Sequence, residues 1–271
     1  KVSEHWDSDP RFEGLKVNES GYVVSDTRSK QNLKILTTAL LSSVDDGKAY
    51  AAKYLDDKVL RFLDGESIAG DRVCYLTFAR SGNTFLRKYL ETITNIPTGS
   101  EMNLTTPMPL TLMGVIGEAI VDDRAWIIKS HDPMRFAALD FESNRVVVTA
   151  RNPFDVLISL STFLNVWSHS KQIENKFEEE DPAWFADSVK ENVEQMKLFF
   201  DNLKKVREKV PVIFFKFEEL RKEPREHLFD MFRFLLARKD LSGTYIEHRI
   251  DEVLAMGHEV THAYKLKTTD G

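Results

Sequence analysis

A short run of small and basic residues is the first part of this sequence that could bind an anion. It spans residues 79–84 and reads Ala-Arg-Ser-Gly-Asn-Thr. A small-residue turn between a strand and a helix presents backbone N–H groups and a helix N-terminus to an anion. Gly82 would allow close backbone approach, and the Arg80 guanidinium suits phosphate. Taken alone, the run is equally an ordinary turn capped by Ser81 or Asn83.

A lysine and a histidine follow the apolar run Trp126–Ile128. They belong to the segment Lys129-Ser130-His131. A histidine at the carboxyl end of a strand can act as a general base near neutral pH. The alternative is a surface histidine without a catalytic role, which is the commoner case for a single histidine.

A third group of polar side chains follows the apolar run Arg145–Ala150. Asn152 and Pro153 have the residue types of a helix N-cap and a first helical residue. Arg151 therefore lies at a strand end, and Ser159 lies two turns into the helix. Both could reach an anion, although Arg151 could instead form a salt bridge with Asp155.

These side chains must be positioned by a regular scaffold. Four short runs rich in Val, Ile and aromatic residues predict buried parallel strands, and helical patterns lie between them. The class is therefore α/β, with three α/β/α layers and a central, mostly parallel sheet. Such sheets bind ligands at the carboxyl ends of their strands, so the three groups should share one edge. The predicted strands are Val73–Phe78, Trp126–Lys129, Arg145–Ala150 and Val212–Phe217.

Besides the helix that follows Asn152, helical segments are predicted in four places. Residues 31–64 carry apolar positions at helical spacing, with a break at Gly47. Asn83–Thr94 follows the first strand, and a helix from the N-cap Asp181 runs to Leu203. The last begins at Pro224 and runs to Leu235.

The whole chain is expected to form one domain over residues 1–271. Its parts would be an extended arm (1–30), the helical segment (31–64), the nucleotide-binding core (71–236) and a helical or lid segment (237–271).

Composition narrows the classes of function that this chain could have. The 271 residues carry a net charge of −6, which disfavours nucleic acid as a partner. No apolar run is long enough to cross a membrane, and no cluster of metal ligands is visible. Cys74 is the single cysteine; it is expected to be buried, and it suits a reducing compartment. A cytoplasmic location is therefore expected, although the first residue is Lys1, which leaves an upstream anchor or address open.

The three groups together resemble one enzyme family. Residues 78–85 are similar to the 5′-phosphosulfate loop of sulfotransferases that use 3′-phosphoadenosine-5′-phosphosulfate (PAPS). Residues 129–133 resemble the segment that holds the catalytic histidine in that family, and 151–159 resemble its 3′-phosphate motif. Residues 217–220 are similar to its fourth-strand segment. The resemblance covers about residues 73–236, in the family's order.

The resemblance implies a P-loop-like nucleotide-binding fold and transfer of a sulfuryl group from PAPS to a hydroxyl or amine, with 3′-phosphoadenosine-5′-phosphate (PAP) as product and no metal. His131 would be the catalytic base, and Arg80 and Lys129 would stabilise charge. The residues that would bind PAPS are Arg80, Ser81, Gly82, Asn83, Thr84, Phe85, Arg151 and Ser159.

The sequence also departs from the family pattern. Phe85 stands where the family has the tryptophan that stacks on adenine, and Phe217 replaces a tyrosine. Ala79 replaces a proline. The family's C-terminal Arg-Lys-Gly segment is not visible.

Two other functions stay open at this point. A P-loop kinase or NTPase would need Gly-Lys-Ser/Thr at the end of the loop, and Arg80–Thr84 lacks that lysine. A non-catalytic PAP-binding scaffold could use the same fold.

The acceptor is expected to be a small molecule or a glycan, and a homodimer is left open. Four aromatic residues could line an acceptor pocket, although at helical spacing core packing is the commoner role. They are Phe163, Trp167, Trp184 and Phe185.

Overall fold

The computed structural model describes eight stretches of the chain: residues 15–17, 23–25, 33–54, 60–63, 71–102, 116–131, 139–166 and 181–257. The statements that follow concern these residues.

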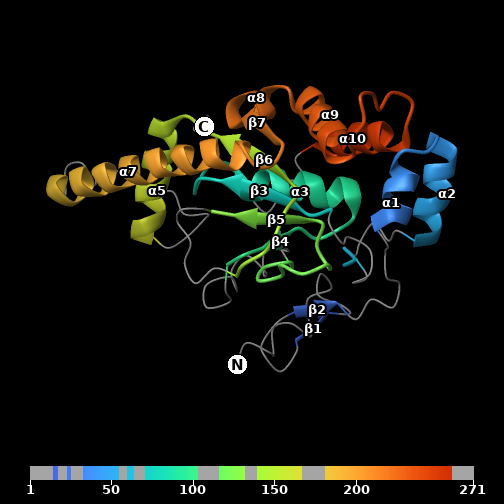
Figure 1. Cartoon of the computed structure of the whole chain (residues 1–271), viewed down its shortest axis with the longest axis horizontal. Helices are drawn as coiled ribbons and strands as arrows, with labels where there is room; N and C mark the ends of the chain where they lie inside the picture. The colour runs from blue at the N-terminus through green and yellow to red at the C-terminus, as the bar shows by residue number, and fades with distance from the viewer. Residues whose placement is uncertain are drawn as a thin grey trace.

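The centre of the molecule is a five-stranded parallel sheet (Figure 1). Its order is β4-β5-β3-β6-β7, so β3 lies in the middle. All four predicted strands are confirmed, with ends that differ by at most one residue. The additional strand, β4, has only two residues, too few for an alternation pattern. The strands are β3 (Val73–Thr77), β4 (Gly99–Ser100), β5 (Ile127–Ser130), β6 (Arg145–Ala150) and β7 (Val212–Lys216).

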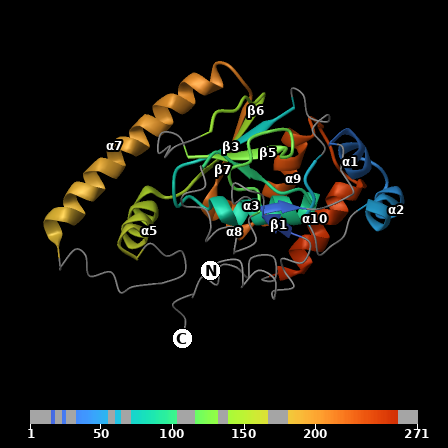
Figure 2. The same cartoon turned by 90° about the horizontal axis from the view of Figure 1, so that it is seen from below.

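Helices cover both faces of this sheet (Figure 2). Side chains of β3 alternate between the two apolar cores: Val73 and Tyr75 pack with α3, α9 and α10, whereas Cys74 and Leu76 pack with α5 and α7. This alternation follows from the two-residue period of a strand. Burial on both faces explains why the strands are continuously apolar. The helices are α3 (Asn83–Thr94), α5 (Pro153–Val166), α7 (Pro182–Arg207), α8 (Phe217–Lys222), α9 (Pro224–Leu235) and α10 (Tyr245–Ala255).

Two predicted helix starts are seen with their caps. The Asp181 carboxylate accepts a hydrogen bond from the Trp184 N–H (3.0 Å) at the start of α7. The Asn152 side chain accepts from the Phe154 N–H (3.0 Å) at the start of α5. Both caps are local, which is why the sequence pattern could predict them.

The prediction of a helix break at Gly47 is wrong. The chain turns at residues 41–43, between α1 (Leu33–Leu40) and α2 (Val44–Tyr54), and Gly47 lies inside α2. A Cβ atom at Gly47 would lie 2.1 Å from the ring of Tyr245 in α10. The glycine is therefore needed for close packing between two helices.

The helical assignment for residues 31–64 is also too long. Residues 60–63 are not helical. The Arg61 N–H donates to the Asn95 carbonyl (3.2 Å), and the Leu63 N–H donates to the Arg124 carbonyl (3.0 Å). These bonds to distant segments replace the i to i−4 bonds of a helix.

The first elements of the described chain are two paired strands, and the last is a helix. In the predicted arm, β1 (Leu15–Val17) pairs antiparallel with β2 (Val23–Ser25). Near the C-terminus, α10 buries Tyr245, Ile246 and Ile250 in the core shared with α3 and α9. None of the helices in the described residues is long and apolar enough to cross a membrane.

Candidate active site

The loop between β3 and α3 has a backbone shaped for close contact. Arg80 and Gly82 have positive φ angles of 66° and 85°. A Cβ atom at Gly82 would lie 2.2 Å from the ring of Phe217, and its φ is one that side chains rarely adopt. Position 82 therefore requires glycine in this fold, and the predicted close approach of its backbone to an anion stays a prediction.

The N-terminus of α3 lacks a side-chain cap. Gly82 occupies the N-cap position and has no side chain to offer. The first helical bond runs from the Leu86 N–H to the Gly82 carbonyl (3.1 Å), and within the described chain no acceptor pairs with the N–H groups of residues 83–85. Unpaired N–H groups and the positive end of the helix dipole create a site for an anion.

Arg80 joins this loop to α5. Its Nε donates to the Ser159 hydroxyl (2.9 Å), and its guanidinium lies 5.3 Å from the centre of the Phe163 ring. Arg151 donates from Nη1 to the Arg80 carbonyl (3.0 Å). The structure therefore brings together Arg80 and Arg151, which the sequence placed after two strands, and Ser159, which it placed in a helix.

Arg151 does not form the alternative salt bridge with Asp155 in the described part of the chain. Its guanidinium instead lies 5.2 Å from the centre of the Phe217 ring. The same ring packs edge-on against Phe85, with 5.6 Å between ring centres. Phe85 and Phe217 therefore form an apolar surface beside the two arginines.

His131 follows the end of β5 and is only partly buried. Its Nδ1 lies 2.7 Å from the Thr77 carbonyl oxygen and 3.1 Å from the Thr77 hydroxyl. A carbonyl oxygen can only accept, so Nδ1 carries the hydrogen and Nε2 presents its lone pair. Burial of the ring and the charge of Lys129 hold the pKa of His131 well below its usual range. The imidazole is therefore neutral at pH 7 and able to accept a proton at Nε2.

Lys129 is almost completely buried, with 2% of its surface exposed. Its Nζ lies 2.9 Å from the Met102 sulfur, a weak acceptor. Burial lowers the pKa of Lys129 to about 8, although the charges of Glu118 and Glu101 oppose this change. The ammonium is thus charged at pH 7, and the nearby buried carboxylates favour this charged form.

Glu101 is a residue that the sequence analysis missed. One of its carboxylate oxygens accepts from the His131 N–H (2.8 Å) and from the Ser130 hydroxyl (2.9 Å). It lies directly after β4, and its side chain is 2% exposed. Glu101 therefore fixes the backbone that carries His131 and adds negative charge beside Lys129. A glutamate after a two-residue strand has no pattern that would have revealed this contact.

A buried ion pair lies behind this group. Arg87 of α3 pairs with Glu118, and both side chains are 1% exposed. Arg87 also donates to the Thr98 hydroxyl (2.6 Å) and the Thr98 carbonyl (2.9 Å). The sequence analysis also missed this network, which ties α3 to Thr98 and Glu118 behind the site.

The aromatic residues expected to line an acceptor pocket belong to α5 and to the start of α7, and their role there stays a prediction. Phe163 packs against the core and beneath Arg80. Trp184 is 36% exposed at the start of α7. Phe185 is partly buried one residue later, and Trp167 lies outside the described residues.

A metal ion would be held by a cluster of ligating side chains. Among the described residues, no group of three or more His, Cys, Asp or Glu side chains could hold a metal ion. The described residues of the site offer N–H groups, guanidinium groups, a neutral imidazole and a buried ammonium. This set is suited to binding a polyanion and accepting one proton.

The known structures that resemble this chain include two sulfotransferases. One is mouse sulfotransferase SULT7A1 in complex with PAP: 13% identity, 93% of this chain and 77% of that chain covered, TM-score 0.43. The other is a sulfotransferase from Alicyclobacillus acidocaldarius: 16% identity, 72% of this chain and 94% of that chain covered, TM-score 0.36.

The sequence itself has no significant match among curated proteins. The sulfotransferase domain model, however, matches residues 70–254. This range runs from the start of β3 almost to the end of α10 and contains every residue of the site just described. The chain belongs to the sulfotransferase family, and it is a sulfotransferase enzyme.

Proposed function

We propose that this enzyme takes its sulfuryl group from PAPS and delivers it to a hydroxyl or amine of a small acceptor, releasing PAP. The observation that carries the proposal is the uncapped N-terminus of α3, with Arg80 bridging from its loop to Ser159. A nucleotide with anionic groups at both its 5′ and 3′ ends matches this pair of neighbouring sites. ATP has no 3′-phosphate.

The residues of the loop would hold the 5′ end of the nucleotide. Backbone N–H groups of residues 82–85 and the side chains of Ser81, Asn83 and Thr84 supply donors. The Arg80 guanidinium supplies positive charge. Phe85 would lie against adenine, and its contact with Phe217 supports an apolar surface there.

Arg151 and Ser159 would hold the 3′-phosphate. Arg151 is kept beside the loop by its bond to the Arg80 carbonyl (3.0 Å). The Ser159 hydroxyl accepts a hydrogen bond from Arg80 Nε (2.9 Å), so it also lies beside the loop. A planar guanidinium and a hydroxyl are suitable donors for a phosphate dianion.

His131 would act as general base. Its Nδ1–H donates to the Thr77 carbonyl, which leaves Nε2 to take the proton of the acceptor hydroxyl. As the proton leaves, the acceptor oxygen forms its bond to sulfur, and the bond from sulfur to the bridging oxygen of PAPS breaks. A positioned base of this kind contributes about 10²–10⁴-fold to rate.

Arg80 and Lys129 would stabilise the negative charge that develops on the leaving group. The buried position of Lys129 strengthens such an effect, because charges interact more strongly away from water. PAPS itself supplies the activated sulfur–oxygen bond, and no metal is required of the protein in this scheme.

Several finer points remain predictions from the sequence. They are a single domain over residues 1–271, a glycan as the acceptor, a homodimer and a cytoplasmic location.

Thermal unfolding with three nucleotides tests the proposal. PAP should raise the melting temperature clearly without Mg²⁺, whereas adenosine-5′-phosphate and ATP with Mg²⁺ should do so weakly. A ligand at a hundredfold excess over its Kd stabilises by about 2.7 kcal/mol, which this method resolves. Equal stabilisation by ATP with Mg²⁺ would favour a kinase, and absence of any nucleotide effect would refute PAPS as the donor.

A second measurement separates an enzyme from a PAP-binding scaffold. Labelled sulfate should leave PAPS when a panel of phenols, alcohols and amines is supplied. PAP binding with no transfer to any acceptor class would favour the scaffold.

A further inference from the structure

The outer edge of β7 has backbone groups that no strand in the described residues uses. β7 ends the sheet order, with β6 as its neighbour. The Val146 N–H of β6 donates to the Pro211 carbonyl (2.9 Å). Successive residues of a strand point their backbone groups to opposite sides. The N–H and C=O groups of Val212 and Phe214 and the N–H group of Lys216 therefore point away from the sheet. Lys216 is the N-cap of α8, so its carbonyl belongs to that helix.

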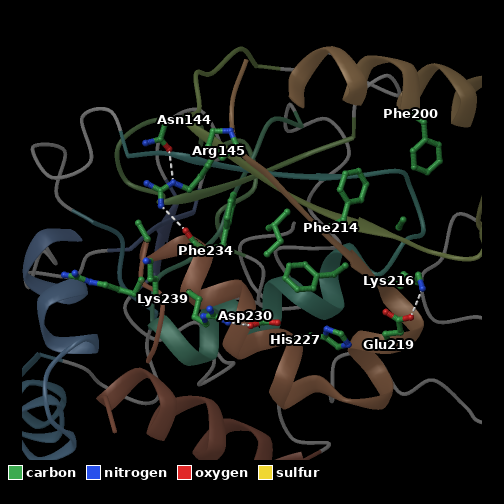
Figure 3. Close-up of a pocket in the computed structure, with 17 residues that line it drawn as sticks. Asn144, Arg145, Phe200, Phe214, Lys216, Glu219, His227, Asp230, Phe234 and Lys239 are labelled. Carbon is green, nitrogen blue, oxygen red and sulfur yellow. Dashed lines mark hydrogen bonds and ion pairs between the residues drawn. The ribbon is translucent and has the colours of Figure 1, made fainter. Parts of the chain in front are cut away.

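A groove of about 1120 Å³ runs along this edge, between α7 and α9. Figure 3 shows Phe200 and Phe214 toward α7, and His227 and Asp230 on α9. The two phenylalanines are 41% and 42% exposed. Large aromatic side chains with this exposure, beside unpaired strand groups, are typical of a surface that receives another segment.

The groove is basic although the whole chain is acidic. Five Lys and Arg side chains line it, against the carboxylates of Glu219 and Asp230. Each carboxylate already pairs with a cation of the groove, at 2.7 Å and 2.9 Å. Arg145 pairs with Asp71 (2.7 Å), which does not line the groove. Arg238 and Lys239 are exposed and form no ion pair within the described residues. The net charge of the groove is thus opposite to the −6 of the chain.

We propose that this groove binds an extended acidic segment of a partner protein, which adds to β7 as a sixth strand. Main-chain hydrogen bonds to β7 would supply affinity, and side chains on alternate faces would supply specificity. Residues pointing to α7 would be apolar and would meet Phe200 and Phe214. Residues pointing to α9 would be acidic and would meet the basic side chains at its C-terminal end.

The charges favour such a partner over a second copy of this chain. Pairing β7 with β7 of a copy would bring two grooves of the same positive sign together, which is unfavourable. An acidic segment instead gains complementary charge. The site is separate from the nucleotide site, so the proposal does not depend on the identity of the sulfuryl donor.

Two labelled peptides of about eight residues, a typical strand length, test the proposal by fluorescence anisotropy. One alternates Val and Glu, and the other alternates Val and Lys. The acidic peptide should bind with a Kd that rises with salt, and the basic peptide should not bind. N-methylation of the peptide backbone on the edge that faces β7 should abolish binding, whereas N-methylation on the opposite edge should not.

Charge reversal in the protein gives the matched comparison. Arg238→Glu with Lys239→Glu should raise the Kd of the acidic peptide at least tenfold. The control Lys48→Glu with Lys190→Glu makes the same change in net charge at exposed positions that do not line the groove, and it should leave the Kd within about twofold.

Four results would overturn the proposal. They are equal binding of both peptides, an unchanged Kd after reversal at Arg238 and Lys239, no binding of the acidic peptide at about 1 mM, and insensitivity to N-methylation. A dimer that sedimentation detects, and that Phe214→Lys dissociates, would also overturn it in favour of self-association. The effect of PAP on the melting temperature measures nucleotide binding without the peptide. Failure of the nucleotide proposal and failure of the groove proposal can therefore be told apart.

Discussion

Replacing Glu101 by glutamine should move the pH at which the enzyme loses nucleotide affinity. The Glu101 carboxylate accepts from the His131 N–H and the Ser130 hydroxyl. Its negative charge also opposes the effect of burial on the pKa of Lys129. Glutamine keeps an oxygen that can accept both hydrogen bonds but removes the charge. The variant therefore separates the electrostatic role of Glu101 from its structural role.

The size of the effect follows from the pKa of Lys129, which burial lowers to about 8. A lysine is charged below its pKa, so nucleotide affinity should fall as pH rises through about 8. Loss of about 1.4 kcal/mol of favourable interaction would lower this pKa by about one unit, to about 7. At pH 8 the charged fraction would then fall from about one half to about one tenth, which is about fivefold. Near pH 6.5 the two proteins should differ by less than about 1.5-fold.

Isothermal titration of PAP between about pH 6.5 and pH 9.5 measures this effect without an acceptor. His131 stays neutral across this range because its pKa lies well below the usual value. The matched control is Glu91→Gln. Glu91 is equally buried and accepts two hydrogen bonds from Thr98, but its charge is not among those that act on Lys129.

Two outcomes would refute the reasoning. If the affinity curves of wild type and Glu101→Gln coincide, the charge of Glu101 does not sustain the Lys129 ammonium. If Glu91→Gln shifts the curve as much as Glu101→Gln does, the shift reflects general loss of buried charge. A PAP affinity that is flat with pH in every variant would remove Lys129 from the nucleotide site.

Three further predictions concern activity and stability. His131→Ala should lower kcat by about 10²-fold or more while PAP affinity changes less than a few-fold; more than a tenth of wild-type kcat would exclude a general base. Arg80→Ala should lower kcat and weaken PAP binding together, and a raised KM with unchanged kcat would show that Arg80 does not act in the transition state. Arg87→Met should cost about 3–5 kcal/mol in urea unfolding, because it leaves the buried Glu118 carboxylate without its partner, and Glu118→Gln in the same chain should recover part of that loss.

Much of the scaffold could be predicted because its signals are local. The strands show as continuous apolar runs, and the helix starts at Asn152 and Asp181 are set by caps within three residues. The turn at Gly82 could be predicted from its place between a strand and a helix, whereas the close packing of the Phe217 ring against it could not. Parallel strands bring their carboxyl ends to one edge whatever the connections between them, and this rule brought Arg80 and Arg151 together.

Contacts between distant segments were decided only by the tertiary structure. Gly47 sits inside a helix because the Tyr245 ring, almost two hundred positions later, packs where a side chain would be. Glu101 meets His131 only because β4 pairs with β5. Lys129 is a buried cation rather than an exposed one, and this burial lowers its pKa, whereas the charge of Glu118 from a distant segment opposes the change. Residue types specify what each side chain can do, but burial and charge from elsewhere in the chain set how strongly it does so, and these depend on packing that no short sequence pattern contains.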